Sequence, residues 1–160
     1  MAKPGQRIVA MAIDESEHSD NAFLWYCENV KKDNDYLLLI HVPETYDFTM
    51  ATVFPKPRDL TGPSVVETLL KELEQRVDIL EKKYREKLQS KGISGKFRTG
   101  SGKPGEVIVT IAKEENSSLV ITGTRGLGKF RRTILGSVSD YIVHHSNVPV
   151  LVCRMKNQNS

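Results

Sequence analysis

The chain has 160 residues, of which 39% are hydrophobic and 27% charged, as in an ordinary globular domain. A chain of this length is expected to form about one domain, whose core is large enough to be stable without disulfide bonds. The net charge of +3 is too weak to indicate a nucleic-acid partner, and no apolar run approaches the ~18 residues of a membrane-spanning helix, so we expect neither nucleic acid nor a membrane as a partner.

The two cysteines, Cys27 and Cys153, each lie in an apolar stretch and form no CxxC pair. This setting favours buried free thiols over a disulfide or a metal site. The amino terminus has no signal-peptide pattern. Together these features predict a cytoplasmic protein with reduced thiols.

The first part of the chain contains two short apolar runs separated by an amphipathic stretch. Residues 7–13 and 36–42 fit strands buried on both faces. Ser16 or Ser19 is expected to cap the helix between them. The residues predicted to face the core from this helix are Ala22, Phe23, Trp25, Tyr26 and Val30.

A long loop and a long helix follow. Residues 43–63 contain four prolines and no periodicity, which predicts a loop. Ser64 and Glu67 form a capping-box pattern that opens a helix ending near Gly92. Its apolar positions recur every three or four residues and predict one buried face, made of Val66, Leu70, Leu73, Val77, Leu80, Tyr84 and Leu88.

The last part of the chain continues the alternation. It contains predicted strands at 94–99, 119–122 and 148–153, and predicted helices opening at Pro104 and covering 138–145. Five buried strands alternating with four helices indicate an α/β fold, a doubly wound five-stranded parallel sheet with helices on both faces. We expect one domain over residues 1–154 and a flexible tail over 155–160. Ligands of such sheets bind beyond the carboxyl ends of strands, here after the first and fourth strands.

The loop after the fourth strand is rich in glycine. Gly123 and Gly126 are separated by two residues, and nine residues then precede Gly136 and Ser137 at a helix start. Glycines let backbone amides approach a ligand, and a helix amino terminus favours anions, so the loop suits a polyphosphate. The alternative is a solvated connecting loop. Three basic side chains nearby fit either a phosphate site or a solvated face: Lys129, Arg131 and Arg132.

The pattern Gly-x2-Gly-x9-Gly-Ser resembles the ATP-binding motif of the universal stress protein family. The resemblance extends over about residues 5–154, because Asp14 with a serine two residues on, the pair His41-Val42, and residues 103–106 and 148–152 also match. It implies a Rossmann-like fold of the adenine nucleotide alpha hydrolase type and the branch of the family that binds ATP.

The resemblance also implies the site for ATP, together with Mg²⁺. The end of the first strand would lie against adenine and ribose, the backbone of Val42 would hold adenine, and the glycine loop would hold ribose and phosphates. Asp14 has an alternative role as a helix cap. No metal ligands are assigned. The implied contact residues are Ala12, Ile13, Asp14, Val42, Gly123, Thr124, Arg125, Gly126, Gly128, Gly136, Ser137, Val138 and Ser139.

No catalytic residue is predicted. The sequence has no GxSxG elbow and no P-loop, and its four histidines fit surface or core positions better than catalytic ones. We therefore expect a nucleotide-dependent sensor or adaptor in the stress response that acts on unidentified protein partners, at most a slow ATPase. The alternatives are a slow ATPase or phosphotransferase and a nucleotide-independent scaffold dimer. Residues 148–152 form an apolar edge strand, and the resemblance implies a homodimer through it.

Overall fold

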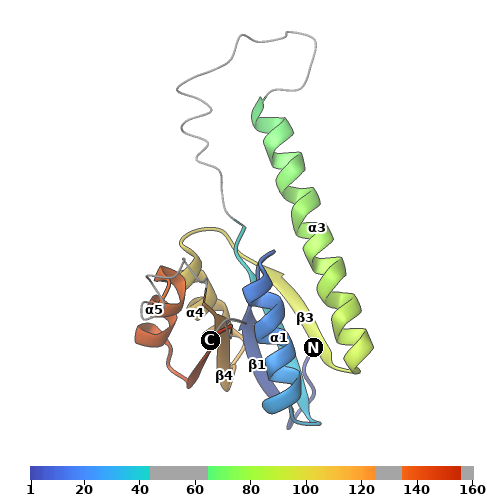
Figure 1. Cartoon of the computed structure of the whole chain (residues 1–160), viewed down its shortest axis with the longest axis vertical. Helices are drawn as coiled ribbons and strands as arrows, with labels where there is room; N and C mark the ends of the chain where they lie inside the picture. The colour runs from blue at the N-terminus through green and yellow to red at the C-terminus, as the bar shows by residue number, and fades with distance from the viewer. Residues whose placement is uncertain (44–64, 125–134, 156–160) are drawn as a thin grey trace.

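A computed structural model describes residues 1–43, 65–124 and 135–155 of the chain. Its five strands form one parallel sheet in the order β3-β2-β1-β4-β5, as Figure 1 shows in part. The strands and helices of the described residues are, in chain order, β1 (Arg7–Ala12), α1 (Glu17–Asn29), β2 (Asp35–His41), α3 (Val65–Lys91), β3 (Ser94–Thr99), α4 (Pro104–Glu114), β4 (Leu119–Gly123), α5 (Ser137–His145) and β5 (Val150–Cys153).

The sheet separates two apolar layers. Alternate residues of a strand point to opposite faces, so Val9 and Met11 of β1 join one layer and Ala10 joins the other. The first layer contains buried side chains of α1 and α3, and the second contains those of α4 and α5. The predicted doubly wound sheet with helices on both faces is thereby confirmed.

The predicted boundaries differ from the observed ones by one or two residues. β1 ends at Ala12 and β2 runs from Asp35 to His41, while β5 begins at Val150. Proline has no N–H to place in the ladder, which explains why the pairing of β5 starts after Pro149. The carbonyl of Pro149 nevertheless accepts the N–H of Val120 at 3.0 Å. Among the described strands, β5 pairs only with β4 and lies at the edge of the sheet, as predicted.

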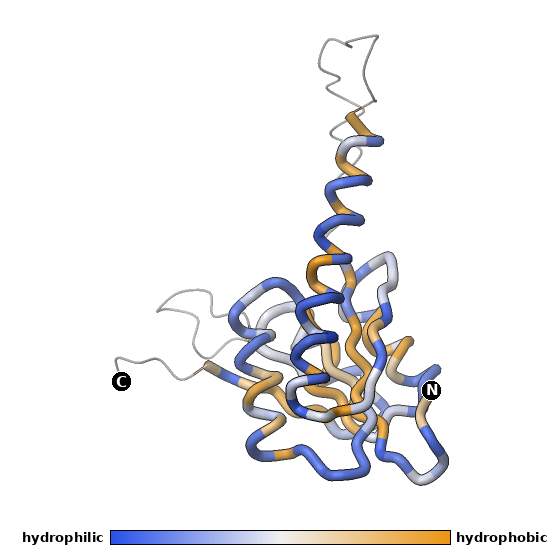
Figure 2. The backbone as a smooth tube through the Cα atoms, turned by 90° about the vertical axis from the view of Figure 1, so that its right-hand side faces the viewer, coloured by the Kyte–Doolittle hydropathy of each residue, from blue (hydrophilic) through white to orange (hydrophobic). Residues whose placement is uncertain are grey.

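The long helix α3 is confirmed, but its buried face is shorter than predicted. Leu80, Tyr84 and Leu88 are buried in the layer shared with α1, whereas Leu70 is 44% exposed. Figure 1 shows the amino-terminal part of α3 extending beyond the body of the domain, and Figure 2 shows hydrophilic and hydrophobic residues alternating along it. The periodicity of the sequence defines the face, but only the second half of the helix reaches the core.

Two predictions about α1 have different outcomes. Tyr26 is completely buried, but the prediction that Trp25 is a core residue is wrong, because its side chain is 39% exposed. Adjacent residues on a helix point about 100° apart, so the stripe through Tyr26 turns Trp25 outward. Cys27 and Cys153 are free thiols, partly buried and buried respectively, and burial raises the pKa of both. No helix within the described parts of the chain has the length and apolarity to span a bilayer.

Candidate functional site

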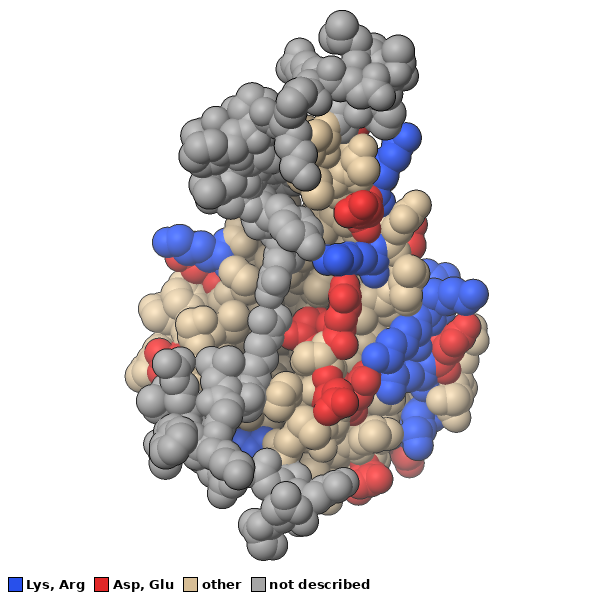
Figure 3. Space-filling view, turned by 45° about the horizontal axis from the view of Figure 1, so that its top comes forward, with Lys and Arg blue, Asp and Glu red and all other residues tan. Residues whose placement is uncertain are grey.

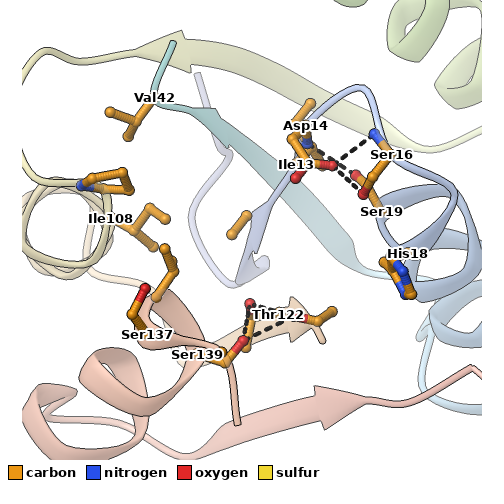
Figure 4. Close-up of a pocket in the computed structure, with 15 residues that line it drawn as sticks. Ile13, Asp14, Ser16, His18, Ser19, Val42, Ile108, Thr122, Ser137 and Ser139 are labelled. Atoms are coloured by element: carbon orange, nitrogen blue, oxygen red, sulfur yellow. Dashed lines mark hydrogen bonds between the residues drawn. The ribbon is translucent and has the colours of Figure 1, made fainter. Parts of the chain in front are cut away.

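The carboxyl ends of the neighbouring strands β1 and β4 lie at the point where the order of the strands in the sheet reverses. β1 leads to β2 on one side, whereas β4 leads to β5 on the other. Parallel sheets bind ligands in the crevice that forms at such a point. A cavity of about 430 Å³ lies there (Figure 4), a volume typical of small-molecule sites. It is lined by Ala12, Ile13, Asp14, Ser16, His18, Ser19, Val42, Pro104, Ile108, Thr122, Gly123, Gly136, Ser137, Val138 and Ser139.

Most of the predicted contact residues line this one cavity. Those that do are Ala12, Ile13, Asp14, Val42, Gly123, Gly136, Ser137, Val138 and Ser139. Thr124 is buried and is not among the lining residues; its N–H donates to the carbonyl of Cys153 at 3.1 Å. The predicted residues Arg125, Gly126 and Gly128 lie outside the described residues, as do positions 44–64 of the predicted loop, the three basic residues at 129–132 and tail residues 156–160.

Six lining residues were not predicted from the sequence, and they come from three elements and one loop. They are Ser16, His18, Ser19, Pro104, Ile108 and Thr122. Ser16, Ser19 and Pro104 were identified as residues that open helices, and Ser16 and Pro104 also as part of the family resemblance, but none was assigned to the site. Because those helices begin at the carboxyl edge of the sheet, their first turns face the crevice, and this position was the available signal.

Asp14 organises the turn between β1 and α1. Its Oδ1 accepts hydrogen bonds from the backbone N–H of Ser16 at 2.8 Å and from the Ser16 hydroxyl (Figure 4). The N–H of Asp14 itself donates to Ser19 Oγ at 3.1 Å. The N-cap residue of α1 is Ser16, so the alternative role of Asp14 as that cap does not hold. The carboxyl group is instead fixed by the turn at the wall of the cavity.

The amino end of α5 forms another wall. Gly136 is the N-cap of this helix, with φ of −60° and ψ of 157°, a conformation open to any residue. A Cβ added at Gly136 would meet no atom of the described residues within 4 Å, so neither its conformation nor packing against the described part of the chain explains the glycine. Ser137 is the first residue of the helix and lines the cavity. The backbone amides of this first turn have no helical partners, and they favour an anion.

Gly123 is required for a different reason. A Cβ at this position would come within 2.9 Å of the carbonyl oxygen of His18, so the end of β4 packs directly against the first turn of α1. The neighbouring carbonyl of Gly123 accepts a hydrogen bond from Ser139 Oγ at 2.8 Å, and Ser139 Oγ also lies 3.3 Å from Thr122 Oγ. The hydroxyl of Ser139 thus ties α5 to β4 and fixes the floor of the cavity.

The histidines and acidic residues of the described chain form no metal centre. His41 is buried and its Nδ1 lies 2.9 Å from the carbonyl oxygen of Ile13, which fits the predicted core position. His18 lines the cavity. Within residues 1–43, 65–124 and 135–155, no three His, Cys, Asp or Glu side chains gather closely enough to hold a metal ion.

Comparisons with known proteins agree with this geometry. The model of the Universal stress protein family matches residues 6–154. The universal stress protein YxiE of Bacillus subtilis is 31% identical over 150 residues, which cover 90% of this chain and 96% of that protein.

Two solved structures share the fold. The universal stress protein UspA of Lactobacillus plantarum superposes with a TM-score of 0.69 at 19% identity, covering 92% of this chain and 97% of that one. A universal stress protein family protein of Arabidopsis thaliana, solved with AMP bound, gives a TM-score of 0.68 at 20% identity, covering 94% and 92%. The family match over nearly the whole chain, together with the sheet order and the position of the cavity, shows that this protein belongs to the universal stress protein family.

Proposed function

We propose that the protein binds ATP in the cavity at the carboxyl edge of β1 and β4. The observation that carries this proposal is the pairing of two walls across one cavity, with Asp14 on one side and the first turn of α5 on the other. The carboxylate of Asp14 suits ribose hydroxyls, which are hydrogen-bond donors. Ala12, Ile13 and Val42 offer apolar surface and backbone groups to the adenine ring.

The phosphates would lie against Gly136 and Ser137. An added Cβ at Gly136 would point into open space, so glycine there leaves room for a phosphate to approach the amide groups. Val138 and Ser139 continue this wall, and Thr124, Arg125, Gly126 and Gly128 are proposed to complete the phosphate site. A magnesium ion would enter the cavity bound to the triphosphate. Asp14 is the carboxylate among the described lining residues that would be available to it. That some structural relatives carry a nucleotide, such as the AMP of the Arabidopsis thaliana protein, supports this proposal.

The bound nucleotide would act as a signal rather than a substrate. The protein is proposed to be a nucleotide-dependent sensor or adaptor of the stress response, working in the cytoplasm on protein partners. Two observations bear on the compartment and on the class of partner. The free thiols Cys27 and Cys153 suit a reducing compartment, and acidic and basic side chains lie side by side on the face seen in Figure 3, unlike the one-sign surface of a nucleic-acid-binding protein.

Calorimetry with ATP, adenosine and inorganic triphosphate tests this proposal. We expect ATP to bind more tightly than either fragment, because the base and the phosphates use different walls of one cavity. Native mass spectrometry of the purified protein would detect nucleotide carried through purification. If none of the three compounds binds, the nucleotide-independent scaffold becomes the better description. If ATP is hydrolysed faster than about once an hour, the protein is instead a slow ATPase.

We further propose that the protein is a homodimer formed by the edge strand at Val148–Val152. Val150, Leu151 and Val152 are only partly buried in one copy, so a second copy would cover an apolar edge by an isologous contact. Val152→Asp would place an unpaired charge in that contact, and it should give single chains in light scattering at micromolar concentration. A wild type with the mass of one chain would refute the dimer, and an undisturbed Val152→Asp dimer would move the interface elsewhere.

A further inference from the structure

A partly buried line of hydrogen bonds leads from the cavity to helix α3. Ser19, which lines the cavity, accepts the N–H of Asp14 at 3.1 Å. The same Ser19 Oγ lies 2.6 Å from Tyr84 Oη, and Tyr84 is separated from it by 65 positions in the chain. Tyr84 Oη in turn donates to Oδ1 of Asp20 at 3.2 Å. One serine therefore holds both the cavity turn and a residue of α3.

Each group in this line donates its hydrogen bond to the next one, in the direction from Asp14 to Asp20. The one hydroxyl proton of Tyr84 goes to Asp20, so the proton of Ser19 must go to Tyr84, and the lone pair of Ser19 accepts the Asp14 N–H. Burial raises the pKa of Tyr84 far above its usual range, so this hydroxyl stays protonated. Hydrogen bonds aligned in this way polarise one another, which makes the line stronger than separate bonds.

The far end of the line is anchored. The Asp20 carboxylate lies 2.9 Å from Lys83 Nζ and 3.6 Å from Lys87 Nζ, both on α3. Tyr84 is completely buried and meets the ring of Phe23 edge to face at a centroid distance of 5.9 Å. Packing thus fixes the tyrosine ring, so its hydroxyl is a rigid support for Ser19.

We propose that Tyr84 is a positioning residue of the ligand site, which it holds in its binding geometry through Ser19 and the Asp14 turn. This inference rests on the proposed ATP site, because Asp14 is the polar wall of that site. It also links α3 to ligand occupancy. By thermodynamic reciprocity, a ligand that favours the held turn must also favour the Tyr84 bond, and so the docked position of α3.

Tyr84→Phe tests the inference, with Tyr26→Phe as a matched control. Both tyrosines are completely buried and both hydroxyls donate to an aspartate, but Tyr26 donates to Asp35 at 2.7 Å at the amino ends of the strands. Tyr84→Phe removes the bonds to both Ser19 and Asp20, and loss of the one to Ser19, at ordinary net strength, should weaken ATP binding about three- to tenfold, measured by calorimetry. Tyr26→Phe should lose stability in urea and keep its affinity for ATP. An unchanged affinity in Tyr84→Phe, or an equal loss in both variants, would overturn the inference.

Two further measurements test whether Tyr84 acts through Ser19, and the second of them needs no ATP. Ser19→Ala removes the middle hydroxyl without changing α3, and we expect the double variant with Tyr84→Phe to bind ATP as weakly as Ser19→Ala alone. Effects that multiply would mean that Tyr84 does not act through Ser19. The Asp14 amide proton should exchange faster in Tyr84→Phe than in Tyr26→Phe even without nucleotide. A wild type that binds no ATP would defeat the proposed function, whereas equal Asp14 exchange in the two variants would defeat the positioning role.

Discussion

The two ends of the sheet use the same kinds of polar side chain. They differ in whether the aspartate at that end is buried inside the protein or borders a cavity. At the amino ends, the Asp35 carboxylate, with a 1% exposed side chain, accepts two bonds from Arg7 at 2.6 Å and one each from Tyr26 and the Lys32 N–H. At the carboxyl ends, the Asp14 carboxylate accepts hydrogen bonds from the N–H and the hydroxyl of Ser16 in its own turn, and it borders a cavity. A carboxylate saturated by the protein stabilises the fold, whereas one fixed beside a cavity can also meet a ligand.

The comparison predicts its largest effect at the amino ends. Asp35→Ala leaves the Tyr26 hydroxyl buried without its acceptor and Arg7 without its counter-charge, and should lower the free energy of unfolding by about 3–5 kcal/mol. Urea denaturation measures this loss. ATP affinity of the folded fraction should remain as in the wild type. A comparable drop in affinity would show that the two ends are not independent.

At the carboxyl ends, Ser137→Ala should do the reverse. A hydrogen bond to a charged group contributes about 1.5–3 kcal/mol, so the substitution should weaken ATP binding about ten- to a hundredfold. The stability should stay within about 0.5 kcal/mol of the wild type. Adenosine serves as the control ligand, since it has no phosphate. An equal loss for ATP and adenosine in calorimetry would remove Ser137 from the phosphate site.

Gly123→Ala is expected to affect both properties. The added Cβ would lie 2.9 Å from the carbonyl oxygen of His18, and relieving this contact should cost about 1–2 kcal/mol of stability. Gly136→Ala is the matched control, because its Cβ meets no atom within 4 Å and its φ of −60° is ordinary. Gly136→Ala should therefore keep its stability and lose only affinity for ATP. Equal stability of the two variants would contradict the direct packing of β4 on α1.

The smallest expected effect is a pH dependence of stability. Burial alone would raise the pKa of Asp35, but hydrogen bonds from Arg7, Lys32 N–H and Tyr26 outweigh it and hold the pKa below its usual range. A carboxyl group with a lowered folded pKa contributes stability above its unfolded value of about 4, and loses it as the pH falls through the folded pKa. Urea midpoints between pH 6 and 3 should fall less steeply in Asp35→Ala than in the wild type. Parallel curves would exclude Asp35 as the group responsible.

Sequence patterns predicted the sheet well because its determinants are local. Runs such as residues 36–42 must be strands buried on both faces in any α/β arrangement, and the alternation with helices then determines the layers. The same reasoning pointed to the loops after the first and fourth strands, and the family resemblance added Ala12; this residue and Asp14, Gly123 and Ser137 line a single cavity.

Contacts between distant segments could not be predicted in this way. Nothing near Tyr84 in the chain indicates that its hydroxyl meets Ser19, since that contact depends on how α3 crosses α1. For the same reason, the apolar stripe of α3 did not reveal that Leu70 is exposed and Leu80 is buried. The spacing of the apolar residues identifies the apolar face of a helix, but tertiary packing decides how much of that face is buried.

Only the second half of α3 packs on the core, so a small tilt of that half moves the amino end of the helix by a larger distance. Leu80 is the buried residue of α3 nearest its amino end, and Val65 lies fifteen residues before it at a rise of 1.5 Å each, so the segment between them is about 22 Å long. Each degree of tilt about Leu80 then moves Val65 by about 0.4 Å. If ligand binding shifts Tyr84 as the proposed link implies, the resulting movement would be larger at the amino end of α3 than at the cavity.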